Sequence, residues 1–373
     1  MSKAKPIHFE NLDGLRAIAA FAVVFAHVSY WFTYPENSFY NGLKSLMSYN
    51  GAGGRLGVIF FFILSGFLIT YLMFIEQQKN GKLNIIYFYI RRVLRIWPLY
   101  FATLIVGFII YPMIVSLLGG TPHENASLFL YSIFAANFDH IYNGYPTSNI
   151  LGVQWSVSVE EQFYVLWPLI FTFFNRKKVF LTLLLVFIGL SELFSIFKAP
   201  DLVGGDYHLF ACLRYLYYGS LIAYFCYNKI DWMKTILSKI GKLLTLLIYV
   251  LSLIIMFFQY DIIERYAGYE KMYHIVPVLF FCFVIVEQNF SKNSFFKISN
   301  IPFLSWLGKI SYGVYLTHMI SLNIVIGLFS NTEEYVLFKA IGVIVLTTLI
   351  SFFSYNTLEK YFLSLKKKFS FFS

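Results

Sequence analysis

Apolar residues occur along this chain in runs of about 17 or more, with few charges inside them. A helix needs about 20 apolar residues to cross a bilayer, so runs of this length predict membrane-spanning helices. We therefore expect an all-α, polytopic membrane protein with about ten transmembrane helices. The predicted spans are residues 14–34, 58–75, 97–118, 156–174, 179–197, 208–227, 243–259, 274–290, 303–329 and 335–358.

The segments between the spans are short, apart from residues 119–155, where the apolar pattern weakens. Residues 128–136 are apolar but too short to span, and predict a helix on the outer face or a re-entrant segment. The third span is expected to begin near Trp97, with Pro98 in its first turn, where proline is tolerated. No soluble stretch of useful size lies outside the spans, so residues 1–373 are predicted to form one integral membrane domain.

The positive charges are distributed unevenly between the loops. The chain is 58% hydrophobic with a net charge of +10, and about 20 of its 29 Lys and Arg fall in one alternating set of loops, together with the N-terminal Lys3 and Lys5. The opposite set holds about five, namely Lys44, Arg55, Lys198, Arg265 and Lys271. This positive-inside bias predicts cytoplasmic termini and a multi-pass protein of the cell (inner or plasma) membrane, embedded in the lipid bilayer. Because orientation accounts for the basic excess, nucleic-acid binding is not expected.

The three cysteines, Cys212, Cys226 and Cys282, all lie in apolar spans. There is no CxxC pattern, so we expect small buried side chains rather than disulfides or metal ligands. No other group of residues has the spacing of a metal site, and none is predicted.

The first predicted span contains an arginine and a histidine. Arg16 and His27 are eleven residues apart, so they share one helical face about 16 Å apart along the axis. Asp13 lies one turn before Arg16. A charge in hydrocarbon costs roughly 3 to 10 kcal/mol, so such residues usually indicate a site or a pathway. The alternatives are an Arg16 that reaches the headgroups and a His27 that hydrogen-bonds between helices.

A basic triplet, Arg91-Arg92-x-x-Arg95, precedes the predicted third span. Arg92 and Arg95 are three residues apart and therefore neighbours on one helical face. We expect them at the cytoplasmic mouth, near a helix N-terminus whose dipole favours anions. Paired arginines suit phosphate binding. The alternative is an ordinary basic anchor at the membrane boundary.

Two adjacent carboxylates lie near the start of the fourth span, in WSVSVEEQFYVLWP. Glu160 and Glu161 are expected at a depth similar to His27, where a carboxylate is costly unless it faces water, a cation or a shared proton. Glu160 shares a face with Ser156 and Tyr164, whereas the neighbours of Glu161 are apolar. Glu160 is therefore the stronger candidate, placed to set the tautomer and basicity of an imidazole.

The segment SYGVYLTH, at residues 311–318 in the first half of the ninth span, carries a polar stripe. Ser311, Tyr315 and His318 follow the spacing i, i+4, i+7, and Tyr312 lies close to the same stripe. Such a stripe indicates either a site or polar contacts between packed helices.

Together these segments resemble the acyltransferase-3 family of integral membrane O-acyltransferases. The matching pieces are the Arg-x10-His of the first span, LGVIFFFILSGFLIT, RRVLRIWPLY, WSVSVEEQFYVLWP and SYGVYLTH, in the family's order over nearly the whole chain. One departure is Ile59, where many relatives carry an acidic residue, so no carboxylate role is expected there. The soluble hydrolase-like domain of some relatives is also not found, so transfer would be completed by the membrane unit or by a partner protein.

The resemblance implies transfer of an acyl group, often acetyl, from a cytoplasmic acyl-CoA to a hydroxyl of an extracytoplasmic glycan or lipid-linked sugar. Acyl-CoA, in particular acetyl-CoA, would be a co-substrate, with no tightly bound cofactor. The resemblance also implies that His27 is the catalytic histidine and that Arg16, Arg92 and Arg95 lie near the donor.

In the mechanism that these residues suggest, the CoA phosphates bind Arg92 and Arg95 and the thioester approaches His27. His27 would act as general base, oriented by Glu160. Transfer in one step and a covalent relay through His27 both fit the sequence. The oxyanion donor would be one of Ser65, Tyr312 and Tyr315. The supporting or acceptor-side residues are expected to be Asp13, Ser65, Glu161, Tyr164, Ser311, Tyr312, Tyr315 and His318.

Other classes of protein would use similar residues. A secondary transporter of an anionic solute would also place Arg and His inside a polytopic bundle, and would show gradient-dependent uptake without release of CoA. A non-catalytic scaffold would leave the buried charges unexplained. A lipid-linked glycosyltransferase is less expected because the chain has no Asp-x-Asp motif.

Overall fold

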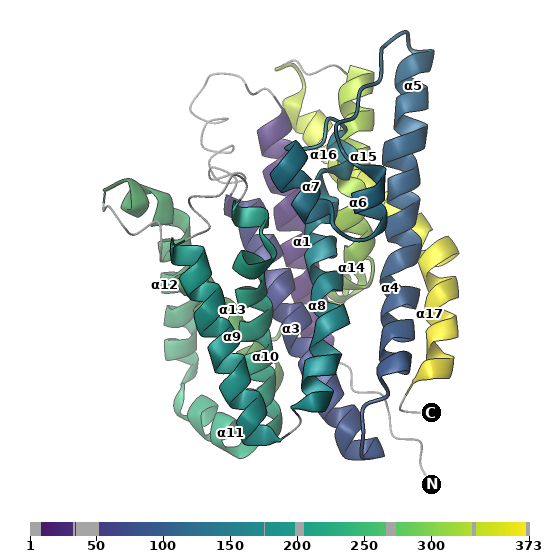
Figure 1. The fold of residues 1–373 in the computed structure, drawn as a ribbon. Helices are drawn as coiled ribbons and strands as arrows, with labels where there is room; N and C mark the ends of the chain where they lie inside the picture. The colour runs from purple at the N-terminus through teal and green to yellow at the C-terminus, as the bar shows by residue number, and fades with distance from the viewer. Residues whose placement is uncertain are drawn as a thin grey trace.

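The computed structural model describes residues 9–32, 34, 52–174, 176–197, 205–265, 274–329 and 333–370. Every regular element in these residues is helical, as the sequence predicts, and the described part contains no strand. The helices run along a common direction and form a bundle (Figure 1). The orientation prediction rests partly on residues outside the described ranges, namely Lys3, Lys5, Lys44, Lys198 and Lys271.

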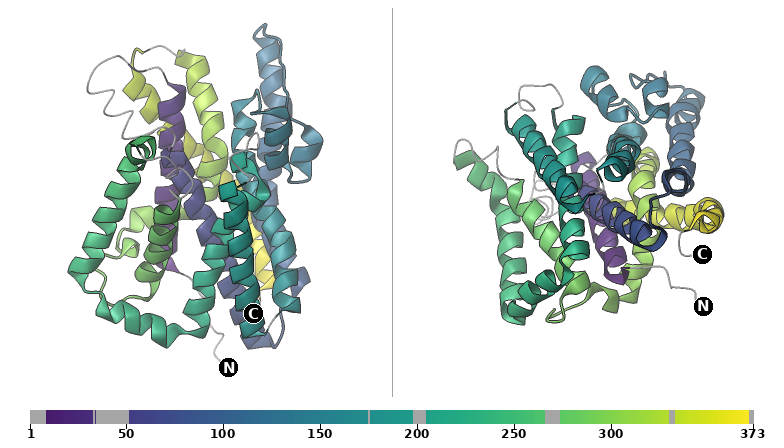
Figure 2. Two further views of the ribbon diagram at one scale, coloured as in Figure 1. Left: turned by 60° about the vertical axis from the view of Figure 1, so that its left-hand side comes forward. Right: turned by 60° about the horizontal axis from the view of Figure 1, so that its bottom comes forward.

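The long helices form the body of the bundle (Figures 1 and 2). They are α1 (Glu10–Trp31), α3 (Ala52–Asn80), α4 (Ile85–Ile105), α8 (Gln154–Phe173), α9 (Lys177–Phe197), α10 (Leu209–Asn228), α12 (Lys242–Arg265), α13 (Ile275–Phe290), α15 (Ser311–Phe329) and α16 (Val336–Ser354). Shorter helices are α5 (Tyr111–Leu117), α6 (Leu128–Ser132), α7 (Ala136–Asn143), α11 (Ile230–Lys239), α14 (Pro302–Lys309) and α17 (Lys360–Lys366). Single helical turns are η2 (Val106–Ile110), η3 (Asn149–Val153), η5 (Gly205–Tyr207), η7 (Ile298–Asn300), η8 (Tyr355–Glu359) and η9 (Lys367–Phe369).

Seven helical units in the described residues are long and apolar enough to cross a membrane, and eight if the bent pair α11–α12 counts as one span. Among them are two long continuous units, Ile85–Leu117 and Val336–Phe369. A multi-pass helical architecture is therefore confirmed, whereas the number of ten spans stays a prediction. Two further helices of the bundle, α8 and α13, are not among these units. α8 is less hydrophobic than they are because it carries two Glu and two Gln, and α13 is short, with only 16 residues.

The described ends of the chain lie at one end of the bundle. α1 begins at the lower end in Figure 1, where α17 also ends. α3 ends and α4 begins at the same level (Figure 1). This arrangement agrees with an even number of crossings, and the assignment of that end to the cytoplasm stays a prediction.

The helix that contains the predicted third span begins earlier than expected. α4 begins at Ile85, well before Trp97, and the side chain of Asn84 caps its first turn by accepting a hydrogen bond from the backbone N–H of Tyr87. Pro98 therefore lies inside the helix. Arg92 and Arg95 lie beyond the second helical turn, so the helix dipole does not add to their attraction for anions.

The predicted ninth span, residues 303–329, is divided into two helices, α14 and α15. The chain breaks at Ile310 between α14 and α15, and both helices pack against α1. A Cβ atom on Gly308 would lie 2.0 Å from the backbone oxygen of Asp13, so only glycine permits this contact between α14 and α1. Hydropathy alone cannot reveal such a break, because both pieces are apolar.

α3 lies at the centre of the fold and crosses α10 closely. A Cβ atom on Gly66 would lie 1.9 Å from the oxygen of Leu216, and one on Gly219 would lie 1.9 Å from the oxygen of Ile63. The two glycines thus let the backbones touch, as small residues do in membrane helix pairs. At the same level, Thr70 Oγ1 donates to Ser220 Oγ at 2.9 Å.

Residues 119–155 form short helices beside the upper part of α8 (Figure 1). The predicted short outer-face helix corresponds to α6, which is followed by α7. The Tyr131 hydroxyl lies 2.9 Å from Nε2 of His140. Burial lowers the pKa of His140 to about 4, so its ring is neutral at physiological pH. We assign this histidine to the packing of this segment.

A buried ionic cluster joins α9, α10 and the start of α13. Glu192 Oε2 lies 2.8 Å from Nε2 of His274 and 3.5 Å from Nη1 of Arg214. The Arg214 guanidinium also donates to the hydroxyls of Ser195 and Tyr215. Arg214 and His274 are both buried. The carboxylate of Glu192 therefore compensates the charge of the Arg214 guanidinium and the polarity of the His274 ring.

Glu192→Gln is expected to destabilise the protein by about 3 to 5 kcal/mol, because it leaves the guanidinium of Arg214 buried without a counter-charge. A melting curve of the detergent-solubilised protein would measure the loss. Glu334→Gln, on an exposed carboxylate, is the matched control. Equal melting temperatures for the two variants would show that the cluster does not stabilise the fold.

Candidate active site

A cavity with a volume of about 100 Å³ lies between α1, α3, α4, α8 and α15. Nine of the thirteen predicted site residues line it, namely Arg16, Ser65, Arg92, Arg95, Glu160, Tyr164, Ser311, Tyr312 and Tyr315. The other four, Asp13, His27, Glu161 and His318, lie outside the lining.

Three arginines give the cavity a positive charge. Arg16 of α1 makes a long ion pair with Asp13, with 3.7 Å between Nη1 and Oδ1. Arg92 and Arg95 of α4 have no ion-pair partner among the described residues, and Nε of Arg92 is buried without a hydrogen-bond partner there. Glu160 is the one carboxylate in the lining, so three positive charges face one negative charge.

Arg91, the first arginine of the triplet, does not line the cavity. Its Nη2 donates to Oε2 of Glu76 at 2.6 Å, and its Nη1 donates to the backbone oxygen of Phe369 at 2.9 Å. It is therefore neutralised locally and links α4 to α3 and to the C-terminal segment.

The two adjacent carboxylates have different surroundings. Glu160 faces the cavity and accepts hydrogen bonds from Ser65 Oγ at 3.0 Å and from the Tyr164 hydroxyl at 2.5 Å. Glu161 points to another side of α8, where it accepts a hydrogen bond from Nε1 of Trp97 at 3.1 Å. This placement agrees with the preference for Glu160 that the helical face suggested.

The polar stripe of α15 reaches the cavity wall through three residues. The Tyr312 hydroxyl donates to the backbone oxygen of Ile96 at 2.8 Å, and Ser311 Oγ donates to the oxygen of Gly308 at 2.8 Å. The Tyr315 hydroxyl lies 2.6 Å from Oγ of Ser156. The stripe therefore connects α15 to α4, α14 and α8.

His27 forms a pair with His318. Nδ1 of His27 lies 2.9 Å from Nε2 of His318, and the rings stack with 5.0 Å between their centroids. His318 is buried whereas His27 is half-buried. The described residues show no contact between Glu160 and His27: Glu160 accepts from Ser65 and Tyr164, and His27 lies against His318.

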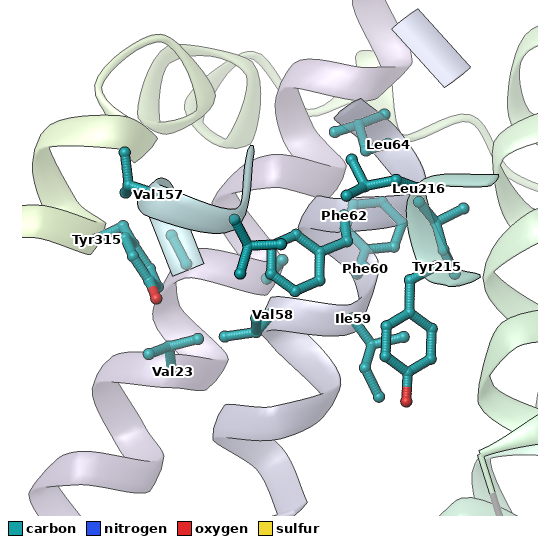
Figure 3. Close-up of a cluster of buried hydrophobic side chains, with 14 of the residues drawn as sticks. Val23, Val58, Ile59, Phe60, Phe62, Leu64, Val157, Tyr215, Leu216 and Tyr315 are labelled. Carbon is teal, nitrogen blue, oxygen red and sulfur yellow. The ribbon is translucent and has the colours of Figure 1, made fainter. Parts of the chain in front are cut away.

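The cavity lies next to this histidine pair. Val58 and Val157 line the cavity, and Figure 3 shows them beside Tyr315 and Val23. Val23 lies one turn before His27 on α1 and is buried. Tyr315 lines the cavity too, and its ring centroid is 6.1 Å from that of His318. The cavity and the histidine pair are thus adjacent, with Tyr315 in the wall between them.

The apolar half of the lining was not predicted from the sequence. Most of these residues come from one face of α3. They are Val58, Phe61, Phe62, Leu64, Leu68 and Ile69 from α3, with Ile96 from α4 and Val157 from α8. Most of them, with Ser65, follow the spacing of three and four residues that marks one helical face. That spacing around a single serine in an apolar stretch of α3 is the signal that could have identified the α3 residues.

These features define an integral membrane protein with a charged cavity and a histidine pair inside its helical bundle. The chain belongs to the acyltransferase-3 family, whose model, described as an acyltransferase domain, matches residues 9–356. The match includes all the predicted site residues.

Several curated relatives are O-acetyltransferases. The chain is 26% identical to the peptidoglycan O-acetyltransferase OatA of Listeria monocytogenes, over 94% of this chain and 55% of the relative. It is 26% identical to a putative O-acetyltransferase of Staphylococcus aureus (strain COL), over 85% of this chain and 51% of the relative. The chain thus spans about half the length of these relatives. No solved structure matches it significantly.

Proposed function

We propose that this protein is a membrane O-acyltransferase that moves an acetyl or similar acyl group from cytoplasmic acyl-CoA to a hydroxyl of an extracytoplasmic glycan or lipid-linked sugar. The observation that carries the proposal is the cavity with Arg16, Arg92 and Arg95, which adjoins the pair of His27 and His318. It brings a candidate site for an anionic donor next to a candidate base. Membership in the acyltransferase-3 family supports the same reaction.

The donor supplies the negative charge that the cavity lacks. Guanidinium groups bind phosphate oxygens through several hydrogen bonds, so Arg92 and Arg95 would hold the phosphates of CoA. The apolar face of α3 would accompany the pantetheine arm. Arg16 and His27 are about 16 Å apart along α1, a distance that an extended arm spans. Tyr315, in the wall, would lie beside the thioester when it reaches His27.

In the proposed reaction His27 takes the proton of the acceptor hydroxyl while the hydroxyl oxygen attacks the thioester carbon. The tetrahedral intermediate collapses, the carbon–sulfur bond breaks, and the departing thiolate takes the proton from His27. The products are the acyl ester and free CoA. The Tyr315 hydroxyl is the donor proposed for the oxyanion, since Tyr315 lines the cavity and its ring centroid lies 6.1 Å from that of His318.

The acceptor is proposed to be a cell-envelope glycan, because the Listeria relative is named as a peptidoglycan O-acetyltransferase. That relative is matched over 55% of its length, so the activity of the whole relative does not carry over directly. The last transfer to the glycan would be made by this membrane unit or by a partner protein. The cell membrane is the proposed location.

Purified protein in liposomes is expected to release CoA thiol from radiolabelled acetyl-CoA and to pass the label to an added membrane glycan fraction. Thiol assay and scintillation counting of the glycan measure the two products. If neither product forms with any acyl-CoA or envelope extract, the proposal fails. The alternative, a secondary transporter of an anionic solute, would then be tested by gradient-dependent flux.

A further inference from the structure

We infer that His318 is a positioning residue that fixes which ring nitrogen of His27 carries the proton. The inference rests on the proposed function, in which His27 is the general base. A neutral imidazole has one N–H donor and one acceptor nitrogen, and only the acceptor nitrogen can take a proton. The hydrogen bonds of the other nitrogen decide which tautomer is present.

The hydrogen-bond chain begins at a backbone carbonyl. Nδ1 of His318 lies 2.6 Å from the oxygen of Tyr315. A carbonyl oxygen can only accept, so Nδ1 of His318 carries a hydrogen and donates it. In the neutral ring, Nε2 of His318 is then the acceptor.

The next contact transmits this choice to His27. Nε2 of His318 lies 2.9 Å from Nδ1 of His27, so Nδ1 of His27 must be the donor. Nε2 of His27 is left with the free lone pair. Because His27 is half-buried and His318 is buried, this free nitrogen belongs to the ring that a substrate can reach.

A charged His318 would reverse the second hydrogen bond, and the surroundings disfavour that state. The ring has a relative exposure of only 1%, and neither histidine forms an ion pair with a carboxylate among the described residues. A buried imidazolium without a counter-charge is costly. The neutral state, with the tautomer order derived above, is therefore favoured.

The helix that carries His318 is held firmly. Thr317 Oγ1 lies 3.2 Å from Oγ of Ser351 on α16, and a Cβ atom on Gly313 would lie 3.1 Å from Cβ of Ser351. α15 therefore packs closely on α16 on one side and meets α1 at the histidine pair. His318 does not touch the reacting atoms in this scheme and acts only through His27.

Two substitutions separate the two hydrogen bonds of His318. In His318→Gln the side-chain oxygen can take the place of Nε2 and accept from Nδ1 of His27. In His318→Asn the amide can still donate to the oxygen of Tyr315, but the side chain is too short to reach His27.

We expect His318→Asn to lower kcat by about 10²- to 10⁴-fold, with the donor KM within about twofold of wild type. The kcat of His318→Gln should stay within about tenfold of wild type. The inference would be overturned if His318→Asn and His318→Gln lost kcat equally while having equal melting temperatures. It would also be overturned if kcat were unchanged in His318→Asn.

Nitrogen NMR of ¹⁵N-histidine-labelled protein in liposomes tests the tautomer without any assay of activity. The His27 signals are assigned by their loss in His27→Gln. We expect protonated Nδ1 and unprotonated Nε2 in the wild type, and a mixture of tautomers in His318→Asn. A wild-type His27 protonated at Nε2 would overturn the inference, even if the protein transfers acyl groups. The expected tautomer in a protein without transferase activity would instead overturn the proposed function alone.

Discussion

His27→Ala is expected to lower the rate of acyl transfer by about 10²- to 10⁴-fold, because no other group then takes the proton of the acceptor hydroxyl. Alanine also removes the hydrogen-bond donor that faces Nε2 of His318. The loss should be seen in kcat, since Arg16 is about 16 Å away along α1 and the proposed phosphate-binding arginines, Arg92 and Arg95, lie on another helix, α4. Initial rates of thiol release in liposomes, at several donor concentrations, measure it.

The matched control is His123→Ala, which removes an exposed histidine outside the cavity and should leave the rate unchanged. Melting curves and the yield of inserted protein show whether each variant is folded. Normal transfer by folded His27→Ala protein would exclude His27 as the base. Thiol release that persists without label in the glycan would instead place His27 on the acceptor side of the reaction.

Arg92→Ala and Arg95→Ala are each expected to raise the donor KM by about 10- to 150-fold. A hydrogen bond to a charged group contributes about 1.5 to 3 kcal/mol, and each 1.4 kcal/mol corresponds to a factor of ten. The value of kcat should change little, because the phosphates are held equally in the ground state and the transition state. Steady-state kinetics with acetyl-CoA give both constants.

A truncated donor separates phosphate binding from a general loss of structure. Acetyl-pantetheine carries no phosphate, so its KM should be the same in wild type and in the arginine variants. Arg176→Ala, on an exposed arginine outside the cavity, is the matched control for the change in charge. If the arginine variants raise the KM of acetyl-CoA and acetyl-pantetheine equally, the phosphate role of Arg92 and Arg95 is wrong.

Helical periodicity in the amino-acid sequence is sufficient to locate much of the cavity lining. Arg92 and Arg95, three residues apart, both line the cavity, and so do Glu160 and Tyr164, four residues apart. The same periodicity puts Glu160 and Glu161 on different faces of α8, and of the two only Glu160 lines the cavity. It succeeds because residues three or four apart share one face of any helix, wherever that helix packs.

Periodicity was less reliable at the ends of helices and could not select partners between helices. It placed the start of the third span near Trp97, because the basic triplet and Pro98 look like a boundary, although α4 begins at Ile85. It also assigned Glu160 to orient His27, since both were expected at one depth. Depth in the membrane does not specify the direction in which a side chain points around its helix axis.

The sequence by itself determined that this chain forms a helical membrane bundle, and it identified the polar residues on helix faces, because hydropathy and the 3.6-residue period are local properties. Only the tertiary structure decided that Arg91 pairs with Glu76 while Arg92 faces the cavity, and that His27 meets His318, 291 residues away in the chain. Such pairs depend on how each helix is rotated and crossed against its neighbours. Close approaches such as that between Gly66 and Leu216 fix this packing, and it is a property of the whole bundle rather than of any one segment.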